Sequence, residues 1–152
     1  MSAERFNTTV YGAIGTCLNK PIVFRLEKAT TNSADYIKFL REDLLPAIDN
    51  RSRFKPILVF DQLRAHKTEP VMERLEPYVI PLPQVTYSSN FNSIETIWSI
   101  AKRSYFKHRL LDKYKLTEEQ FKARVRASIT SIKPSVIKRV MSANRAYLRT
   151  YL

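Results

Sequence analysis

Two acidic residues stand where their side chains could act on a substrate or a metal ion. Asp61 directly follows the apolar run 57–60, and Glu95 lies near the start of a segment with helical spacing of apolar residues. Ligands gather at the carboxyl ends of strands in open α/β folds, so the position of Asp61 favours a site. An aspartate there can also simply cap the next turn. Glu95, three positions after Asn92, can likewise bond back to a helix cap. Spacing alone leaves both interpretations of each acid open.

Hydrophobic periodicity predicts the elements that position these acids. The run 57–60 has no polar alternation, which predicts a central strand covered on both faces. Short β-rich stretches at 10–14 and 22–26 favour an antiparallel hairpin, and 78–82 predicts another strand. Helices are predicted where capping residues or prolines precede apolar periodicity, starting near Asn32, Thr68, Asn92, Thr117 and Pro134. This order predicts one mixed α/β domain over residues 1–152, with a sheet flanked by helices and a basic helical extension at about 107–152.

Composition limits the functional class. The longest apolar runs are only a few residues, which excludes a membrane span and a secretory signal, so we expect an intracellular protein. Residues 99–152 hold fourteen Lys or Arg against three Asp or Glu, whereas the rest of the chain is nearly neutral. Such segregation favours a polyanionic partner, most simply nucleic acid, although a solvated basic face has the same composition. The candidate phosphate-binding residues are Lys102, Arg103, Lys107 and Arg109.

The chain resembles the catalytic domain of mariner-like transposases of the DDE superfamily. The resemblance is carried by the strand 57–60 with Asp61 and His66, and by the segment 87–95 (Tyr-Ser-Ser-Asn-Phe-Asn-Ser-Ile-Glu) followed by Trp98 and Lys102. The family has Asp-Asn at the strand end, a His five residues after the Asp, and Tyr-Ser-Pro-Asp-Leu-Asn-Pro-Ile-Glu before a Trp. The 33 residues between Asp61 and Glu95 also suit the family. The resemblance covers roughly residues 8–110.

The resemblance implies a ribonuclease H-like fold and metal-dependent cleavage and transfer of DNA strands, as in DNA transposition and integration. Asp61 and Glu95 would be catalytic metal ligands, while His66 and Asn92 would line the site. Carboxylates about 4 Å apart repel by roughly 4 kcal/mol at an effective dielectric near 20, so divalent cations are needed to stabilise them together. Mg²⁺ or Mn²⁺ is the expected cofactor and DNA the expected partner. In a eukaryote the expected location is the nucleus.

The chain departs from the family pattern at the first of the three family acids. That Asp lies on an earlier strand, and no Asp occurs among the nine residues before Val10. We therefore expect the first strand to be missing and the isolated chain to lack strand transfer unless another chain supplies the acid. A second transposase chain or another protein would cover the exposed sheet edge. Gln62, Ser89, Asn90 and Ser93 also replace family residues.

Three functions remain open from the sequence. The first is a DDE transposase core with incomplete catalytic machinery. The second is a remnant that binds DNA or a protein partner without catalysis. The third is an unrelated basic α/β protein that binds RNA. Nicking of plasmid DNA by the wild type and by variants of Asp61 and Glu95 separates the first from the second.

Overall fold

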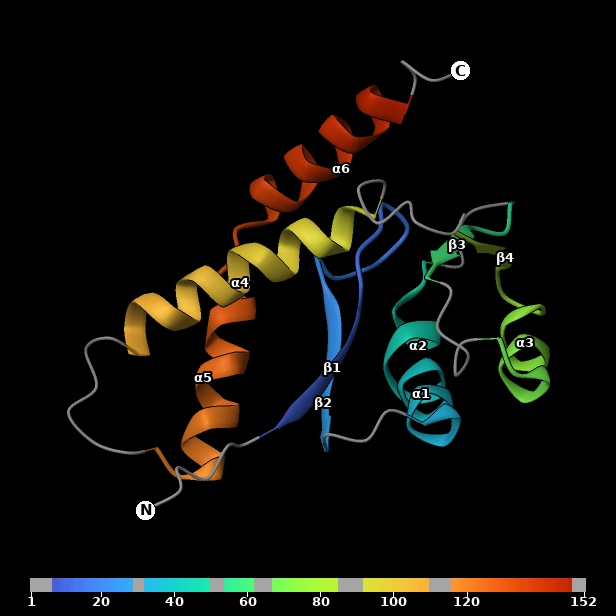
Figure 1. Ribbon diagram of the computed structural model, residues 1–152. Coiled ribbons are helices and arrows are strands. Elements are labelled where there is room, and N and C mark those ends of the chain that lie inside the picture. Colours follow the sequence, from blue (N-terminus) through green and yellow to red (C-terminus); the bar gives the residue numbers. More distant parts are fainter. Residues whose placement is uncertain are drawn as a thin grey trace. The chain divides into compact units, whose positions relative to one another are not determined.

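The chain divides into two compact units in the computed structural model (Figure 1). The strand unit comprises Thr9–Ser89, and the helical unit comprises Met1–Thr8 with Asn90–Leu152. The structure describes residues 7–28, 32–49, 54–61, 67–84, 92–109 and 116–148.

The strand unit contains two small sheets. Strands β1 (Thr8–Ala13) and β2 (Val23–Lys28) form the first, which confirms that the two β-rich stretches pair. Strands β3 (Ile57–Phe60) and β4 (Ile80–Pro83) pair in parallel in the second. The predicted bounds of β3 are confirmed, whereas β4 begins two residues later than predicted. The carboxyl ends of both parallel strands lie at the same end of the sheet, and Asp61 follows β3 there.

A helical segment follows β2 and starts at the predicted cap. Helix α1 (Ser33–Phe39) is capped by Asn32, whose side chain accepts a hydrogen bond from the Asp35 N–H at 2.8 Å. The segment continues as a π-helix, η1 (Leu40–Leu44), and as the short helix α2 (Leu45–Ala47). Pro46 has no N–H to donate inside the helix. The segment ends at Ile48, which has extended backbone angles.

The hydrophobic core of the strand unit lies between the α1–α2 segment, the first sheet and helix α3 (Glu69–Leu75). Leu40, Val71 and Leu75 are completely buried. The rings of Tyr11 and Tyr36 lie 5.6 Å apart, and the Phe39 ring stacks near both. Aromatic pairs at these separations add to the stabilisation from burial alone. This core holds the second sheet through Leu58, which packs against it.

The prediction that β3 is covered on both faces is wrong. Ile57 and Val59 are 62% and 54% exposed, whereas Phe60 is buried. Alternate residues of a strand point to opposite faces, so Ile57 and Val59 lie on the face away from the core. A short run of apolar residues gives no signal of which face stays open, because both faces carry the same residue types.

The helical unit consists of α4 (Ser93–Arg109), α5 (Glu118–Thr130) and α6 (Pro134–Leu148). Helices α5 and α6 both pack on α4 (Figure 1). The buried apolar residues that the structure describes in the helical unit are Ile97, Ala101, Ile129, Ile132 and Ile137. The predicted capping box of α5 is confirmed, because the Thr117 hydroxyl accepts from the Gln120 N–H and the Gln120 side chain accepts from the Thr117 N–H.

The fold class is confirmed. The described elements are a mixed α/β unit with two small sheets, followed by a C-terminal series of helices. This combination is consistent with a ribonuclease H-like fold.

Candidate metal and nucleic-acid site

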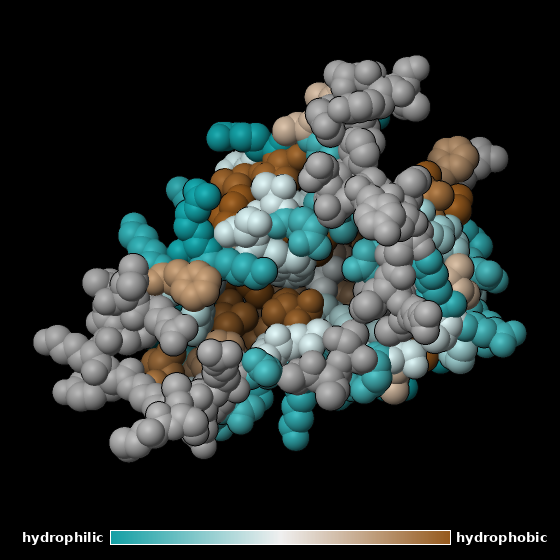
Figure 2. Space-filling model, in the orientation of Figure 1, coloured by the Kyte–Doolittle hydropathy of each residue, from teal (hydrophilic) through white to brown (hydrophobic). Residues whose placement is uncertain are grey.

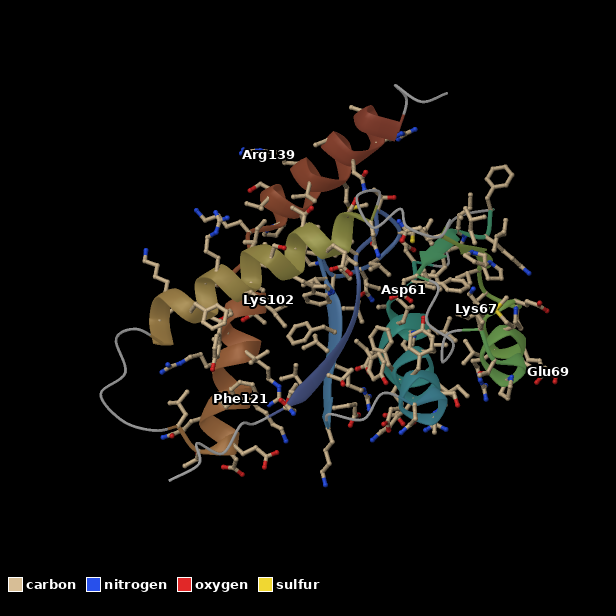
Figure 3. All side chains as sticks on the ribbon, viewed as in Figure 1. Asp61, Lys67, Glu69, Lys102, Phe121 and Arg139 are labelled. Carbon is tan, nitrogen blue, oxygen red and sulfur yellow. The ribbon has the colours of Figure 1, made fainter. Side chains whose placement is uncertain are left out.

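Asp61 stands at the end of the parallel β3–β4 pair, as its sequence position predicts. The Phe60 carbonyl accepts a hydrogen bond from the Gln84 N–H at 2.7 Å, so the pairing continues up to the residue before Asp61. Asp61 itself is exposed (Figure 3). The backbone of β3 thus carries a carboxylate to the open end of the sheet.

The charge of Asp61 acts on the phenol of Tyr36, a residue of α1. Burial is the main cause that raises the Tyr36 pKa well above its usual value, and the negative charge of Asp61 raises it further. Tyr36 is 6% exposed whereas Asp61 is exposed, so water screens part of this interaction. No local pattern in the sequence points to this pair, because 24 residues lie between its members.

Glu95 lies in the first turn of α4 and is exposed. Asn92 caps this helix: its side-chain oxygen accepts from the Ile94 N–H at 3.4 Å, and its carbonyl accepts from the Glu95 N–H at 3.1 Å. Among the described residues, no bond joins the Glu95 carboxylate to the Asn92 N–H. A negative charge in the first turn also interacts favourably with the helix dipole.

One face of α4 carries Glu95 together with a cation. Ser99, Lys102 and Phe106 follow Glu95 by four, seven and eleven residues, which at 100° per residue places all four side chains within about 60° of one another. All four are exposed. We call these residues the α4 site face. Ser99 and Phe106 were not singled out in the sequence, although their helical spacing from Glu95 is visible there.

The other predicted nucleic-acid residues lie beside this face. Arg103 and Lys107 are exposed on the flank of α4, and Figure 2 shows hydrophilic side chains gathered over α4 on the visible side. Arg109 is the last residue of α4, and its side chain falls outside the described part of the chain, as does the whole of His66. Within the described ranges, no helix is long and apolar enough to cross a membrane.

The donor atoms of the two acids suit a hard divalent cation. Carboxylate oxygens are the ligands that Mg²⁺ and Mn²⁺ prefer. Asp61 belongs to the strand unit and Glu95 to the helical unit. The described residues contain no group of three or more Asp, Glu, His or Cys side chains placed to hold a metal ion. The donor type therefore fits the expected cofactor, and the two acids belong to different units.

Comparison with known proteins identifies the family. A search of curated proteins gave no match. The family model described as DDE superfamily endonuclease matches residues 2–118, a range that includes both Asp61 and Glu95. Because this match spans most of the chain, the chain belongs to the DDE superfamily endonuclease family.

Proposed function

We propose that this chain is a transposase-type nuclease domain of the mariner-like kind, with Asp61 and Glu95 as two of its metal-binding carboxylates. The α4 site face carries this proposal, because it presents a carboxylate and, two turns further along the same exposed face, the Lys102 ammonium. Along the helix axis they stand about 10 Å apart. A DNA strand with its scissile phosphate at Glu95 would therefore meet Lys102 a few phosphates away.

Each residue of the proposed site has a distinct task. Asp61 and Glu95 would hold Mg²⁺ or Mn²⁺, which when bound supplies charge stabilisation for a phosphodiester displacement. Lys102, Arg103 and Lys107 would bind flanking phosphates and fix the position of the strand. The cap at Asn92 fixes where α4 begins and hence where Glu95 points. With DNA as substrate, the protein would act in the nucleus of a eukaryotic cell.

We also propose that a second chain pairs with the outer edge of β3. The carbonyls of Pro56 and Phe60 accept hydrogen bonds from β4, so the backbone groups of Ile57 and Val59 point to the opposite edge. On β4 the outward positions are Pro81 and Pro83, which have no N–H to donate. In this sheet, strand addition therefore suits the edge of β3 rather than that of β4. A second copy of this chain is the partner we propose.

Plasmid nicking in Mg²⁺ or Mn²⁺ tests the nuclease assignment. We expect at least about 10-fold less nicking for Asp61→Asn and for Glu95→Gln than for the wild type, because each variant loses one carboxylate that would hold the metal. Glu73→Gln, a change of an exposed α3 glutamate, is the matched control and should nick like the wild type. Nicking that survives in both acid variants would contradict the proposal.

The alternative is a DNA-binding or protein-interaction module without catalysis. The basic flank of α4 and the open edge of β3 support that function equally well. It predicts that the wild type and all variants leave the plasmid intact while they bind it with the same affinity. Nicking lost in both acid variants excludes it.

A further inference from the structure

Among the side chains of helix α6 that the structure describes, those on the exposed side are cations and small residues. The exposed cations are Lys138, Arg139 and Arg145, and the other exposed residues are Pro134, Ser135, Ser142, Ala143 and Ala146. The opposite side buries Ile137 and half-buries Val136, Val140, Met141 and Asn144. We call Lys138, Arg139 and Arg145 the α6 cations. Small residues between them leave room for a large partner to approach the helix backbone.

The charge pattern of this side differs from that of an ordinary solvated helix. Solvated faces usually mix both signs and carry ion pairs between neighbouring turns. Residues 120–152 contain eight Lys or Arg and no Asp or Glu. None of the α6 cations forms an ion pair with another described residue. Such a face attracts a partner of opposite charge.

Contacts within the helical unit place α6 next to the start of α4. The two helices pack together, and the Asn144 side-chain N–H donates to the Ser93 hydroxyl at 2.7 Å. Ser93 is the first residue of α4, two positions before Glu95. Ser93 lies about 160° around α4 from Glu95, so this bond joins α6 to the side of α4 away from the α4 site face. Figure 3 shows Arg139 on α6 and Lys102 on α4.

We propose that the exposed side of α6 binds the sugar–phosphate backbone of duplex DNA, as a surface separate from the α4 site face. Lys138 and Arg145 are seven residues apart, which is about 10 Å along the axis and about three phosphate intervals of one strand. The choice of DNA as the polyanion rests on the proposed nuclease function. Helix α6 lies beyond residues 2–118, so it adds a surface that the family match does not include.

The test is the salt dependence of binding to a fluorescent 30-base-pair duplex, measured by anisotropy without divalent metal. The variant Lys138→Ala/Arg139→Ala/Arg145→Ala should lower the slope of log affinity against log salt by about 2.7, at about 0.9 for each phosphate contact. Taking 1 M salt as the point where counterion release contributes nothing, this corresponds to about 100-fold weaker binding at 0.15 M salt. Alanine suits a helix, so circular dichroism should show α6 intact.

A matched control separates local contact from net charge. Lys20→Ala/Lys28→Ala/Arg74→Ala removes the same charge from exposed positions of the strand unit and should change the slope by less than about 1. The exchange Lys138→Arg/Arg139→Lys/Arg145→Lys should keep the wild-type slope. Equal slopes for the α6 variant and the control would overturn the proposal. A loss of binding to phosphatidylserine vesicles with unchanged DNA binding would overturn it too.

This result is independent of nicking. A reduced slope in a chain that never nicks DNA supports DNA binding by α6 and contradicts only the nuclease assignment. If nicking requires Asp61 and Glu95 but the α6 variant keeps the wild-type slope of log affinity against log salt, only the role of α6 is contradicted.

Discussion

The buried phenol of Tyr36 couples the core of the strand unit to the charge of Asp61. Burial disfavours the phenolate, and the Asp61 carboxylate disfavours it further, so the folded protein holds the Tyr36 proton more tightly than the unfolded chain does. The unfolded chain releases this proton near pH 10, its ordinary value. The stability that this group contributes is thus fully present below about pH 10 and is lost as the pH rises further.

Replacing Tyr36 with Phe should remove this part of the pH dependence. Urea unfolding between pH 8 and pH 11.5 should show the wild type losing up to about 1.4 kcal/mol per pH unit above pH 10 from this group, and Tyr36→Phe lacking that loss. Tyr78→Phe, at a 47% exposed position, is the control and should retain the wild-type slope. If Tyr36→Phe and the wild type decline in parallel, the phenol is not the titrating group.

At the residue scale, the sequence predicted where both acids lie but not their surroundings. Asp61 stands at a strand end and Glu95 in a first helical turn. Both positions were predictable, because local patterns of apolar residues and caps determine them. The charge of Asp61 acts on Tyr36, and that interaction depends on how the chain folds rather than on spacing along it. Distant pairs of this kind leave no trace in one sequence.

At the scale of elements, an ion-pair network joins β2 to η1. The Arg25 guanidinium donates to Asp43 and, at 2.8 Å, to Glu42, and its side chain is only 18% exposed. The bond to Asp43 is the main cause that raises the Arg25 pKa. A guanidinium fork that holds two carboxylates is more specific than a single contact. Because all the partners remain partly exposed, solvent screens the network and its contribution to stability is modest.

Arg25→Ala should lower the free energy of unfolding by about 1–2 kcal/mol, since it leaves two carboxylates beside each other without their shared cation. Arg41→Ala is the matched control, because Arg41 also binds Glu42 but is 59% exposed, and it should change stability little. Urea unfolding at low and high salt measures both, with the Arg25 effect shrinking at high salt. Equal effects of the two variants on the free energy of unfolding would show that the Arg25 network adds no more stability than an exposed ion pair.

The open edge of β3 predicts self-association of the chain. If a second copy pairs there, Val59→Lys should abolish self-association, because a charge on an edge strand opposes strand addition. Leu82→Lys places the same charge on the neighbouring strand β4 and should leave association intact. Sedimentation equilibrium compares the three proteins. A wild type that stays monomeric at high concentration would contradict pairing of copies.

Local chemistry explains which elements were predictable. The cap at Asn32, the capping box at Thr117 and the bounds of β3 each depend on a few neighbouring residues, and all are confirmed. The π-helix at Leu40–Leu44 was not predicted, because apolar spacing there fits an ordinary helix equally well. The exposure of Ile57 and Val59 was also missed, since it depends on what lies beyond β3 rather than on the strand itself.

At the scale of the whole molecule, the segregation of charge follows the division into units. Residues 99–152 carry a net charge of +11, from fourteen Lys or Arg and three Asp or Glu, and all belong to the helical unit. The two acids of the proposed site are split, with Asp61 in the strand unit and Glu95 in the helical unit. The proposed function therefore requires both units to contribute to one metal site. That a single domain spans residues 1–152 remains a prediction.

Binding of Mn²⁺ in a double-mutant cycle tests this requirement most directly. Isothermal titration of the wild type, Asp61→Asn, Glu95→Gln and the double variant gives the affinity of each, with Asp35→Asn as a control for the loss of one acid. If both carboxylates hold the same ion, each single variant should bind Mn²⁺ at least about 10-fold more weakly, and the double variant should lose far less than the product of the two. Independent, multiplicative losses, or wild-type affinity in either single variant, would contradict a shared metal site.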